Sequence, residues 1–245
     1  MSKATETKEE ILQGPGFHVL EGLIDVDRAN QVREFVLAHL DEGQELNPGD
    51  VNLTDLLERD EMFEALVTHP ELLAVVHEML GEDAKLAALT AKTLMPGCGQ
   101  GRLHVDYPYW AMDPGMPVEP ALMLQVIWMM QPFGPDNGGT WVLPGSQVRD
   151  GQVDIDEFKH AAVQIKGGAG DAFLSHGLLW HQTAVNHSTE PRVAILINFS
   201  QLAIRPLREM GPFSERFLGR ASDEMKQLLP LDINAEFFTR LRKNY

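Results

Sequence analysis

The residues with the clearest chemical potential are His104 and Asp106, which are separated by a single valine in the run Leu103-His104-Val105-Asp106. In an extended segment side chains alternate between two sides, so this spacing directs the imidazole and the carboxylate the same way. Together they can hold a divalent metal ion, and a histidine from elsewhere would complete a facial triad of the kind that binds non-haem Fe(II). Taken alone, the triplet is weak evidence, because a surface histidine beside a solvated aspartate gives the same pattern.

The third ligand is expected from a second cluster, which contains His176, His181 and His187. His187 falls in a polar turn, where a solvated role is the default. His176 stays open as an alternative ligand or as a buried partner of the true one. His181 is favoured, because the adjacent Trp180 would help to exclude water and because His181 is predicted to share a strand face with Arg192.

The segment that follows His181 suggests a site for a small dicarboxylate. If the strands on either side of the polar turn pair with Val185 opposite Arg192, then His181, Thr183 and Arg192 lie on one face. The backbones of His181 and Arg192 are then about 13 Å apart, at about 3.3 Å per residue. One end of a dicarboxylate could chelate the metal, while the guanidinium of Arg192 would bind the other end as a bidentate pair.

Helical patterns dominate the first third of the chain, ahead of these motifs. Apolar residues recur every three or four positions over 25–42, over 53–66 and over 70–81, as in amphipathic helices. Residues 1–13 are highly charged and show no apolar period, so we expect them to be flexible or a lead-in to the first element. The sequence therefore predicts that 14–83 is mainly helical.

After Gly81 the chain changes to short apolar runs separated by Gly, Pro and Asn, which predicts an antiparallel two-sheet sandwich or jelly roll over 84–210. A last helical pattern over 223–241, interrupted at Pro230, makes 211–245 a C-terminal helical segment. There is no repeat, low-complexity tract or long linker, so we expect 1–245 to form a single domain. The apolar runs lie at 86–94, 122–130, 140–143, 172–174 and 192–200.

The composition is that of an ordinary globular protein, with 44% hydrophobic and 23% charged residues among 245. The apolar runs are too short for a membrane span. A net charge of −16 argues against nucleic acid as a partner, although 20 acidic and only 6 basic residues in 1–89 account for most of it. The single cysteine, Cys98, and a polar, acidic start without the features of a secretion signal predict a cytoplasmic protein.

Further motifs accompany the ligand candidates in a fixed order: His69-Pro70-Glu71-Leu72-Leu73, Gln125-Val126-Ile127-Trp128, Asn137-Gly138-Gly139-Thr140, Pro144-Gly145-Ser146-Gln147, Gly170-Asp171, Trp180-His181, Asn186, Ser188 and Arg192. Over roughly residues 17–210 this ordered set resembles the phytanoyl-CoA dioxygenase family of Fe(II)- and 2-oxoglutarate-dependent oxygenases. The resemblance implies a mainly β protein with flanking helices, in which an N-terminal helical section precedes a double-stranded β-helix (jelly roll, cupin-like) core.

The resemblance also implies roles for individual residues. Arg192 would bind the distal carboxylate of 2-oxoglutarate, Thr183 would assist that carboxylate, and Trp128 would line the co-substrate pocket. As alternatives, Thr183 is an ordinary strand residue and Trp128 a core tryptophan. The metal ligands would be His104, Asp106 and His181.

By the same resemblance, Fe(II), 2-oxoglutarate and O2 would oxidise a small organic substrate, with release of succinate and CO2. Related halogenases replace the carboxylate ligand by a small residue, so the intact Asp106 favours a hydroxylase. Tyr107, Tyr109 and Trp110 are expected to line the substrate pocket, although aromatic residues are also common in β cores. Two alternatives are a non-oxidative metal-dependent enzyme on a cupin-like fold, which would not need Arg192, and a catalytically silent binding protein.

Overall fold

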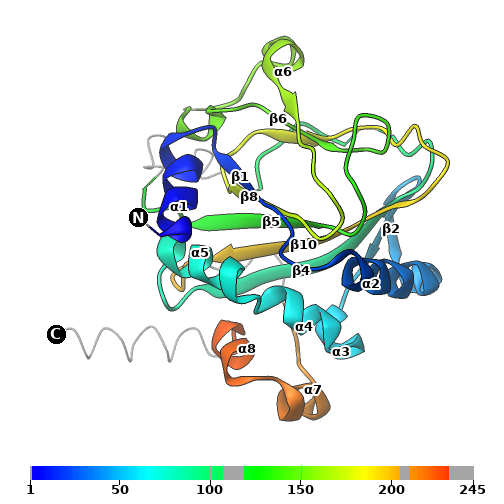
Figure 1. Cartoon of the computed structure of the whole chain (residues 1–245), viewed down its shortest axis with the longest axis vertical. Helices are drawn as coiled ribbons and strands as arrows, with labels where there is room; N and C mark the ends of the chain where they lie inside the picture. Colours follow the sequence, from blue (N-terminus) through cyan, green and yellow to red (C-terminus); the bar gives the residue numbers. More distant parts are fainter. Residues whose placement is uncertain (1, 100, 107–118, 150, 205–209, 232–245) are drawn as a thin grey trace.

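The computed structural model describes residues 2–99, 101–106, 119–149, 151–204 and 210–231. Within these ranges, two β-sheets face each other, and most helices lie on the far side of the larger sheet (Figure 1). The helices are α1 (Lys3–Gln13), α2 (Val26–Ala38), α3 (Leu56–Arg59), α4 (Met62–Val67), α5 (Pro70–Leu80), α6 (Ile155–Ala161), α7 (Glu215–Arg220) and α8 (Asp223–Leu228), with short 3-10 helices at Leu40–Glu42 and Ser146–Val148.

The larger sheet has seven strands in the order β1-β8-β5-β10-β4-β3-β2, and the smaller sheet has three in the order β7-β6-β9. All of these neighbours pair antiparallel. From β5 onward the chain passes back and forth between the two sheets, as in a jelly roll, and this prediction is confirmed. The strands are β1 (Phe17–Leu20), β2 (Gln44–Asn47), β3 (Asp50–Leu53), β4 (Lys85–Leu94), β5 (Met123–Met129), β6 (Thr140–Val142), β7 (Val163–Gln164), β8 (Ala172–His176), β9 (His181–Thr183) and β10 (Arg192–Ser200).

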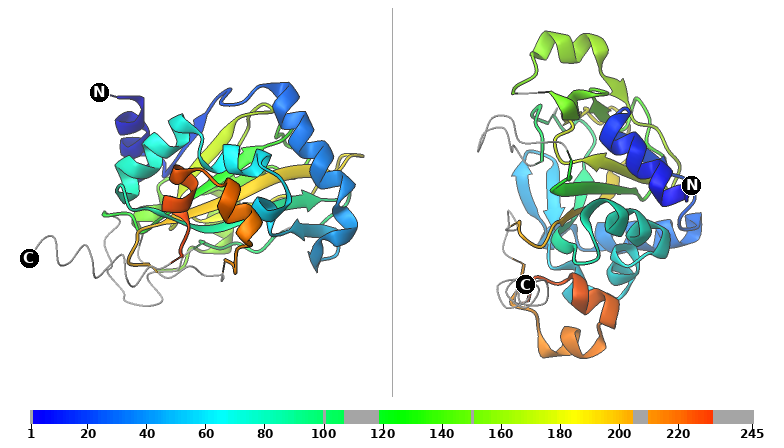
Figure 2. Two further views of the ribbon diagram at one scale, coloured as in Figure 1. Left: turned by 90° about the horizontal axis from the view of Figure 1, so that it is seen from below. Right: turned by 90° about the vertical axis from the view of Figure 1, so that its left-hand side faces the viewer.

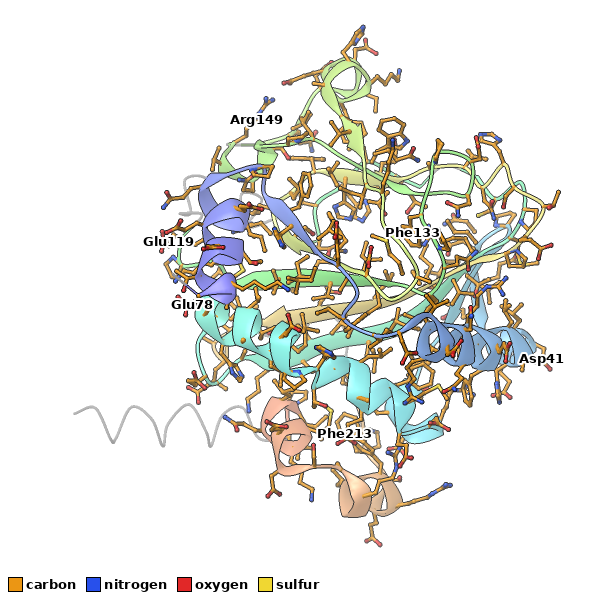
Figure 3. All side chains as sticks on the ribbon, in the orientation of Figure 1. Asp41, Glu78, Glu119, Phe133, Arg149 and Phe213 are labelled. Atoms are coloured by element: carbon orange, nitrogen blue, oxygen red, sulfur yellow. The ribbon has the colours of Figure 1, made fainter. Side chains whose placement is uncertain are left out.

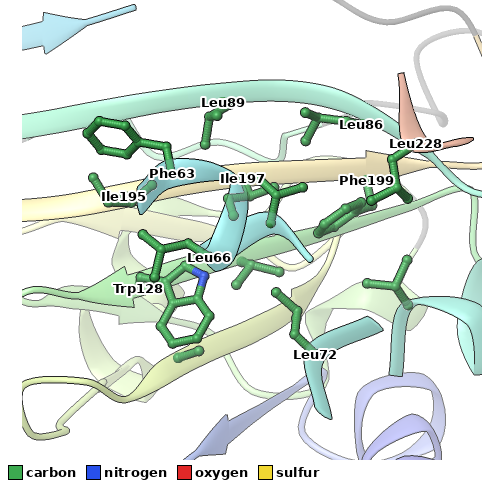
Figure 4. Packing of buried hydrophobic residues seen from close by; sticks show 14 of the residues in the cluster. Phe63, Leu66, Leu72, Leu86, Leu89, Trp128, Ile195, Ile197, Phe199 and Leu228 are labelled. Atoms are coloured by element: carbon green, nitrogen blue, oxygen red, sulfur yellow. The ribbon is translucent and has the colours of Figure 1, made fainter. Parts of the chain in front are cut away.

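Strand β10 shows how the larger sheet divides into two faces. Its odd-numbered residues from Val193 to Phe199 are fully buried in a large apolar cluster that they form with the helices. We call this helix-covered side of the sheet the outer face. The even-numbered residues of β10 from Arg192 to Asn198 point to the smaller sheet, since side chains alternate along a strand. We call this second side the inner face. The packing on the outer face is shown in Figure 4, where helix residues near the strand include Phe63, Leu66 and Leu72.

The space between the two sheets holds a smaller apolar cluster. Phe133, which follows β5, lies in this space (Figure 3). The cluster contains Ile127, Met129, Phe133, Val142, Ile165, Phe173, Leu179 and Ala194. The inner face therefore combines this apolar cluster with polar side chains, and one of them, Arg192, lies over the ring of Phe133.

The N-terminus differs from its prediction. Residues 3–13 form the ordered helix α1, whose first turn is capped by the hydroxyl of Ser2 accepting a hydrogen bond from the amide of Thr5 at 3.1 Å. Ile11 and Leu12 are buried in the cluster that also contains residues of α5. The expectation of a flexible segment is wrong, because a few apolar contacts to another element can stabilise a helix that lacks a clear apolar period.

The segment 14–83 is less uniformly helical than predicted. Helices α2 and α5 are confirmed, and the pattern over 53–66 divides into α3 and α4. The same segment also contributes β1, β2 and β3, which extend the larger sheet at both edges. Each of these strands has only four residues, too few for a reliable alternation pattern. The boundary at residue 84 is therefore not the boundary of the sheet.

The C-terminal segment is helical as far as Leu228, and residues 232–241 of the predicted helix lie outside the described residues. Helices α7 and α8 lie against α3 and α4 (Figure 2). Glu58 of α3 accepts hydrogen bonds from the amide and the hydroxyl of Ser214, and Glu64 of α4 accepts one from the amide of Ser222. In the part of the chain that the structure describes, no helix has both the length and the apolarity to cross a membrane.

Candidate active site

The three predicted metal ligands come together between the two sheets. The candidate ligand atoms of His104, Asp106 and His181 all lie within 4.8 Å of one another. His104 and His181 form an isolated antiparallel bridge, in which each backbone amide donates to the other residue's carbonyl, at 3.1 and 2.9 Å. This bridge sets the imidazole rings side by side, with their centroids 4.2 Å apart. The predicted grouping of these residues is what the fold produces.

Both imidazoles are held with one nitrogen free. Nδ1 of His104 lies 2.7 Å from the carbonyl of Arg102, and Nδ1 of His181 lies 2.9 Å from the carbonyl of Leu179. A carbonyl only accepts hydrogen bonds, so each Nδ1 carries the proton and donates it, which leaves the lone pair on Nε2. The pKa of His104 is lowered, first by desolvation and then by repulsion from His181, so its neutral form is favoured.

The carboxylate of Asp106 faces both free nitrogens with a single oxygen. Oδ1 lies 3.8 Å from Nε2 of His104 and 3.6 Å from Nε2 of His181. Oδ2 accepts a hydrogen bond from the side-chain amide of Asn198 at 2.9 Å. The donor set of two neutral imidazoles and one carboxylate fits Fe(II), with protein atoms approaching from one side only.

Arg192 is a buried cation without a counterion. Its side chain is 2% exposed, donates to the carbonyl of Gly138 at 2.7 Å and lies over the ring of Phe133. Among the described residues, its Nε has no hydrogen-bond partner, and no carboxylate lies within ion-pair distance. Burial lowers the pKa of Arg192 to about 10, so the guanidinium is still charged at neutral pH. The unused donor and a charge that Asp50 offsets only from beyond ion-pair distance fit an anionic ligand.

The predicted pairing of Val185 with Arg192 is wrong. Strand β9 pairs with β6 in the smaller sheet, whereas β10 pairs with β4 and β5 in the larger one, and Arg192 lies opposite Leu94. His181 and Arg192 are therefore positioned by the packing of one sheet on the other. Strands β9 and β10 therefore do not form a hairpin, because each of them pairs within a different sheet.

The prediction for Trp128 is also wrong. Trp128 lies opposite Ile195, is fully buried on the outer face and contacts the ring of His69 edge-on, with 5.8 Å between the ring centroids. Its neighbour Ile127 lies opposite Leu196 and faces the smaller sheet. One residue along a strand reverses the direction of the side chain. Trp128 is therefore a core tryptophan, the alternative that the sequence left open.

The remaining candidates divide into three groups. Thr183 lies opposite Thr140 in the smaller sheet and lines the cleft beside His104. His176 lies opposite Leu124, its Nδ1 accepts a hydrogen bond from the amide of Leu178, and among the described residues it is not part of the group formed by His104, Asp106 and His181. The predicted pocket residues lie outside the described part of the chain: Tyr107, Tyr109 and Trp110.

The cleft itself has a volume of about 710 Å³ and opens beside His104. Its polar part contains an ion pair that sequence reasoning missed, between Nζ of Lys92 and Oδ2 of Asp50 at 2.7 Å. Asn52 donates to the other oxygen of Asp50 at 3.1 Å. The available signal was Lys92, a lysine in the otherwise uncharged run 86–94, and the pairing of β10 with β4 places it on the same face as Arg192.

The apolar part of the cleft is formed by two segments on opposite sides. Leu46 and Ile155, which are 46% and 43% exposed, both line it. Single exposed apolar side chains are common on protein surfaces, but these two line the same cleft together with further apolar residues. The other apolar lining residues are Leu103, Val105, Val153 and Trp180.

A jelly roll that carries a His-Asp-His triad and a buried arginine defines a class of metal-dependent enzymes. The chain belongs to the phytanoyl-CoA dioxygenase (PhyH) family, whose sequence profile matches residues 16–194.

Relatives of this chain are spread over fungi and bacteria. The dioxygenase af480 of Aspergillus fumigatus is 27% identical over 188 residues, a match that covers 76% of this chain and 60% of that protein. The uncharacterized protein Rv1501 of Mycobacterium tuberculosis is 26% identical over 213 residues, covering 79% of this chain and 74% of the relative. This chain thus spans less than two thirds of the Aspergillus fumigatus relative.

Solved structures have the same fold. The non-heme alpha ketoglutarate dependent epimerase SnoN from nogalamycin biosynthesis matches with a TM-score of 0.67 and 18% identity, covering 86% of this chain and 93% of SnoN. Its complex with Fe3+, alpha ketoglutarate and nogalamycin RO matches with a TM-score of 0.66 and 16% identity, covering 86% and 95%. Identity at this level shows a shared fold.

Proposed function

We propose that this protein is an Fe(II)- and 2-oxoglutarate-dependent dioxygenase that oxidises a small organic substrate. The observation that carries the proposal is the combination of a preoriented triad, His104, Asp106 and His181, with the buried and unpaired cation of Arg192. A metal site alone fits many enzymes. A metal site together with a buried cation that makes no ion pair with the described residues fits a chelating dicarboxylate.

The protein's own residues have separate tasks in this proposal. His104, Asp106 and His181 would hold Fe(II), and the guanidinium of Arg192 would bind the distal carboxylate of 2-oxoglutarate. Thr183 and Lys92 line the cleft and offer a hydroxyl and a second positive charge for the same anion. When bound, iron, 2-oxoglutarate and O2 supply the oxidising power, with succinate and CO2 as products. The chain contributes orientation, charge and exclusion of water.

We further propose a substrate with a largely apolar body. The cleft lies within the range of 300–1,000 Å³ typical of small-molecule pockets, and its outer part is lined by apolar side chains such as Leu46 and Ile155. The fungal relatives named as dioxygenases and the nogalamycin-binding SnoN support a small-molecule substrate. Intact Asp106 favours hydroxylation over halogenation.

The decisive experiment is an anaerobic titration of the protein with Fe(II) and 2-oxoglutarate. We expect a weak charge-transfer band in the visible that is absent in His181→Ala and weakened in Arg192→Ala, followed by succinate formation once O2 and a substrate are added. A protein that binds Fe(II) but produces neither band nor succinate would instead be a non-oxidative metal enzyme. A protein that binds neither iron nor 2-oxoglutarate would be a binding protein of the same fold.

The substrate proposal is tested with Nile red, a neutral apolar dye, as the probe. We expect Leu46→Asp and Ile155→Asp to weaken dye binding about tenfold, because a charge replaces apolar surface at the cleft. Val26→Asp and Val163→Asp alter side chains that are equally exposed, at 56% and 42%, but do not line the cleft. They are matched controls, and equal losses in all four variants would contradict the proposal.

A further inference from the structure

Asn198 is the one inner-face residue of β10 whose side chain contacts a candidate metal ligand among the described residues. It is an amide in an otherwise apolar stretch of strand, Ala194–Phe199. Its Nδ2 lies 2.9 Å from Oδ2 of Asp106 and 3.7 Å from the sulfur of Met123. A carboxylate offers only acceptors, so the amide nitrogen must face it and donate.

The strand geometry gives this amide the room to reach Asp106. Asn198 lies opposite Ala88 and Phe199 opposite Leu86, so Ala87 is an extra residue in β4 and marks a β-bulge. Bulges change the aim of side chains and are common beside active sites. Two consecutive alanines also leave a cavity of about 150 Å³, which is lined by Ala87, Ala88, Asp106 and Asn198 among others.

Because of this hydrogen bond, the two oxygens of Asp106 face different partners. Oδ1 faces Nε2 of His104 and of His181, whereas Oδ2 is turned to Asn198. A hydrogen bond to a charged carboxylate is stronger than one between neutral groups. An oxygen held in this way is restrained from turning to a metal at the position of the imidazole nitrogens.

We infer that Asn198 is a positioning residue that keeps Asp106 a one-oxygen ligand of the metal. The inference rests on the proposed function, since it concerns how the triad would hold Fe(II). A carboxylate that bound through both oxygens would occupy one of the positions left open by a facial triad. Asn198 thereby preserves the open positions that a chelating co-substrate and O2 both need.

The test uses Co(II), an air-stable substitute for Fe(II) whose visible spectrum reports coordination geometry, and the full-length protein. Asn198→Ala removes the donor, and we expect the affinity for Co(II) to fall 10- to 100-fold, the usual effect of removing a group that orients a metal ligand. The spectrum of the remaining bound Co(II) should also change, because Asp106 is free to use both oxygens. A merely structural residue would lower stability without altering that spectrum.

Two further variants complete the test. Gln125 lies directly opposite Asn198 on β5, and its Oε1 accepts from the hydroxyl of Ser175. Gln125→Leu therefore removes a neighbouring amide from the same face, and we expect wild-type Co(II) affinity and spectrum. Asn198→Gln returns an amide donor next to the cavity and should recover most of the affinity and the wild-type spectrum. If the alanine variant fails to fold, Asn198→Leu, which removes the donor but keeps a side chain of similar size, tests the change of spectrum.

The outcomes separate this inference from the proposed function. If wild type binds Co(II) and Asn198→Ala binds it with equal affinity and an unchanged spectrum, the role of Asn198 is refuted while the metal site stands. If wild type does not bind Co(II) at all, the proposed metal site itself is refuted.

Discussion

The two faces of the seven-stranded sheet are built from alternate residues of the same strands, yet they differ in almost every property. The outer face of β10 presents Ile195 and Phe199 to a continuous apolar cluster under the helices. The inner face of the same strand carries the buried cation of Arg192 and the amide that holds Asp106. A stable core and a polar site thus share one backbone.

The difference teaches that stability and chemistry are separable at single-residue spacing in this protein. Phe199 and Asn198 are adjacent in the chain, but one packs among helices and the other contacts a candidate metal ligand. A charged side chain such as that of Arg192 can follow or precede an outer-face residue in the strand, because the pleat directs it away from the apolar cluster. Substitutions on the outer face should therefore change mainly the free energy of unfolding, and substitutions on the inner face mainly the affinity for metal or 2-oxoglutarate.

The largest expected effect is on the outer face. Phe199→Ala should lower the free energy of unfolding by about 3–5 kcal/mol, because the phenyl ring is completely buried and its removal leaves a cavity. The Co(II) affinity of the folded variant should equal that of wild type. Urea denaturation and a metal titration check the two parts, with the exposed Val26→Ala as the control for stability. A parallel loss of metal affinity would show that the faces are not separable.

The next effect is on the inner face. Arg192→Met should weaken 2-oxoglutarate binding about 100-fold, since hydrogen bonds to charged groups contribute about 1.5–3 kcal/mol each. Stability should fall by less than in Phe199→Ala, because an apolar side chain of similar length replaces a buried cation that has no counterion. Calorimetric titration and thermal unfolding measure both. Unchanged 2-oxoglutarate affinity would remove the basis for assigning the anion to Arg192.

A smaller effect is expected at the cleft. Lys92→Met removes one positive charge and leaves Asp50 unpaired, which would repel a dianion. We expect the affinity for 2-oxoglutarate to fall about tenfold and that for Co(II) to change little, and the same titrations measure this. Lys92→Arg keeps the charge and serves as the control. If both variants bind 2-oxoglutarate equally, the charge of Lys92 has no part in binding it.

The smallest effect is the dependence of 2-oxoglutarate binding on pH. Arg192 is protonated below its pKa of about 10, which burial has lowered from the usual value. The affinity should therefore stay constant between about pH 7 and 9 and decline only as the pH rises through about 10, where the guanidinium loses its charge. Titrations with metal-loaded protein at each pH test this. A decline that begins near neutral pH would point to another titrating group.

Sequence patterns alone identified the class of fold and the residues grouped as candidate metal ligands. The triplet around His104 and Asp106 needs only local alternation to direct two side chains the same way, and short apolar runs with turn residues between them identify a β architecture. His181 was favoured over His176 as the third metal ligand because Trp180 is its neighbour and because it was predicted to share a strand face with Arg192. The roles assigned to Arg192 and Thr183 remain proposals: Thr183 lines the cleft beside His104, and Arg192 is buried on the inner face of β10.

The neighbours of each strand, and the face on which each side chain lies, became known only from the three-dimensional arrangement of the sheets. Local alternation says that Trp128 and Ile127 point in opposite directions, but not which of them faces the site. The pairing assumed for Val185 and Arg192 failed because the two strands joined different sheets. Asn198 could not be connected to Asp106 from the sequence, since they lie 92 positions apart and the register of β10 on β4 shifts beside Asn198 at a bulge. Long-range pairing of this kind is fixed by the packing of whole layers, which no single stretch of sequence encodes.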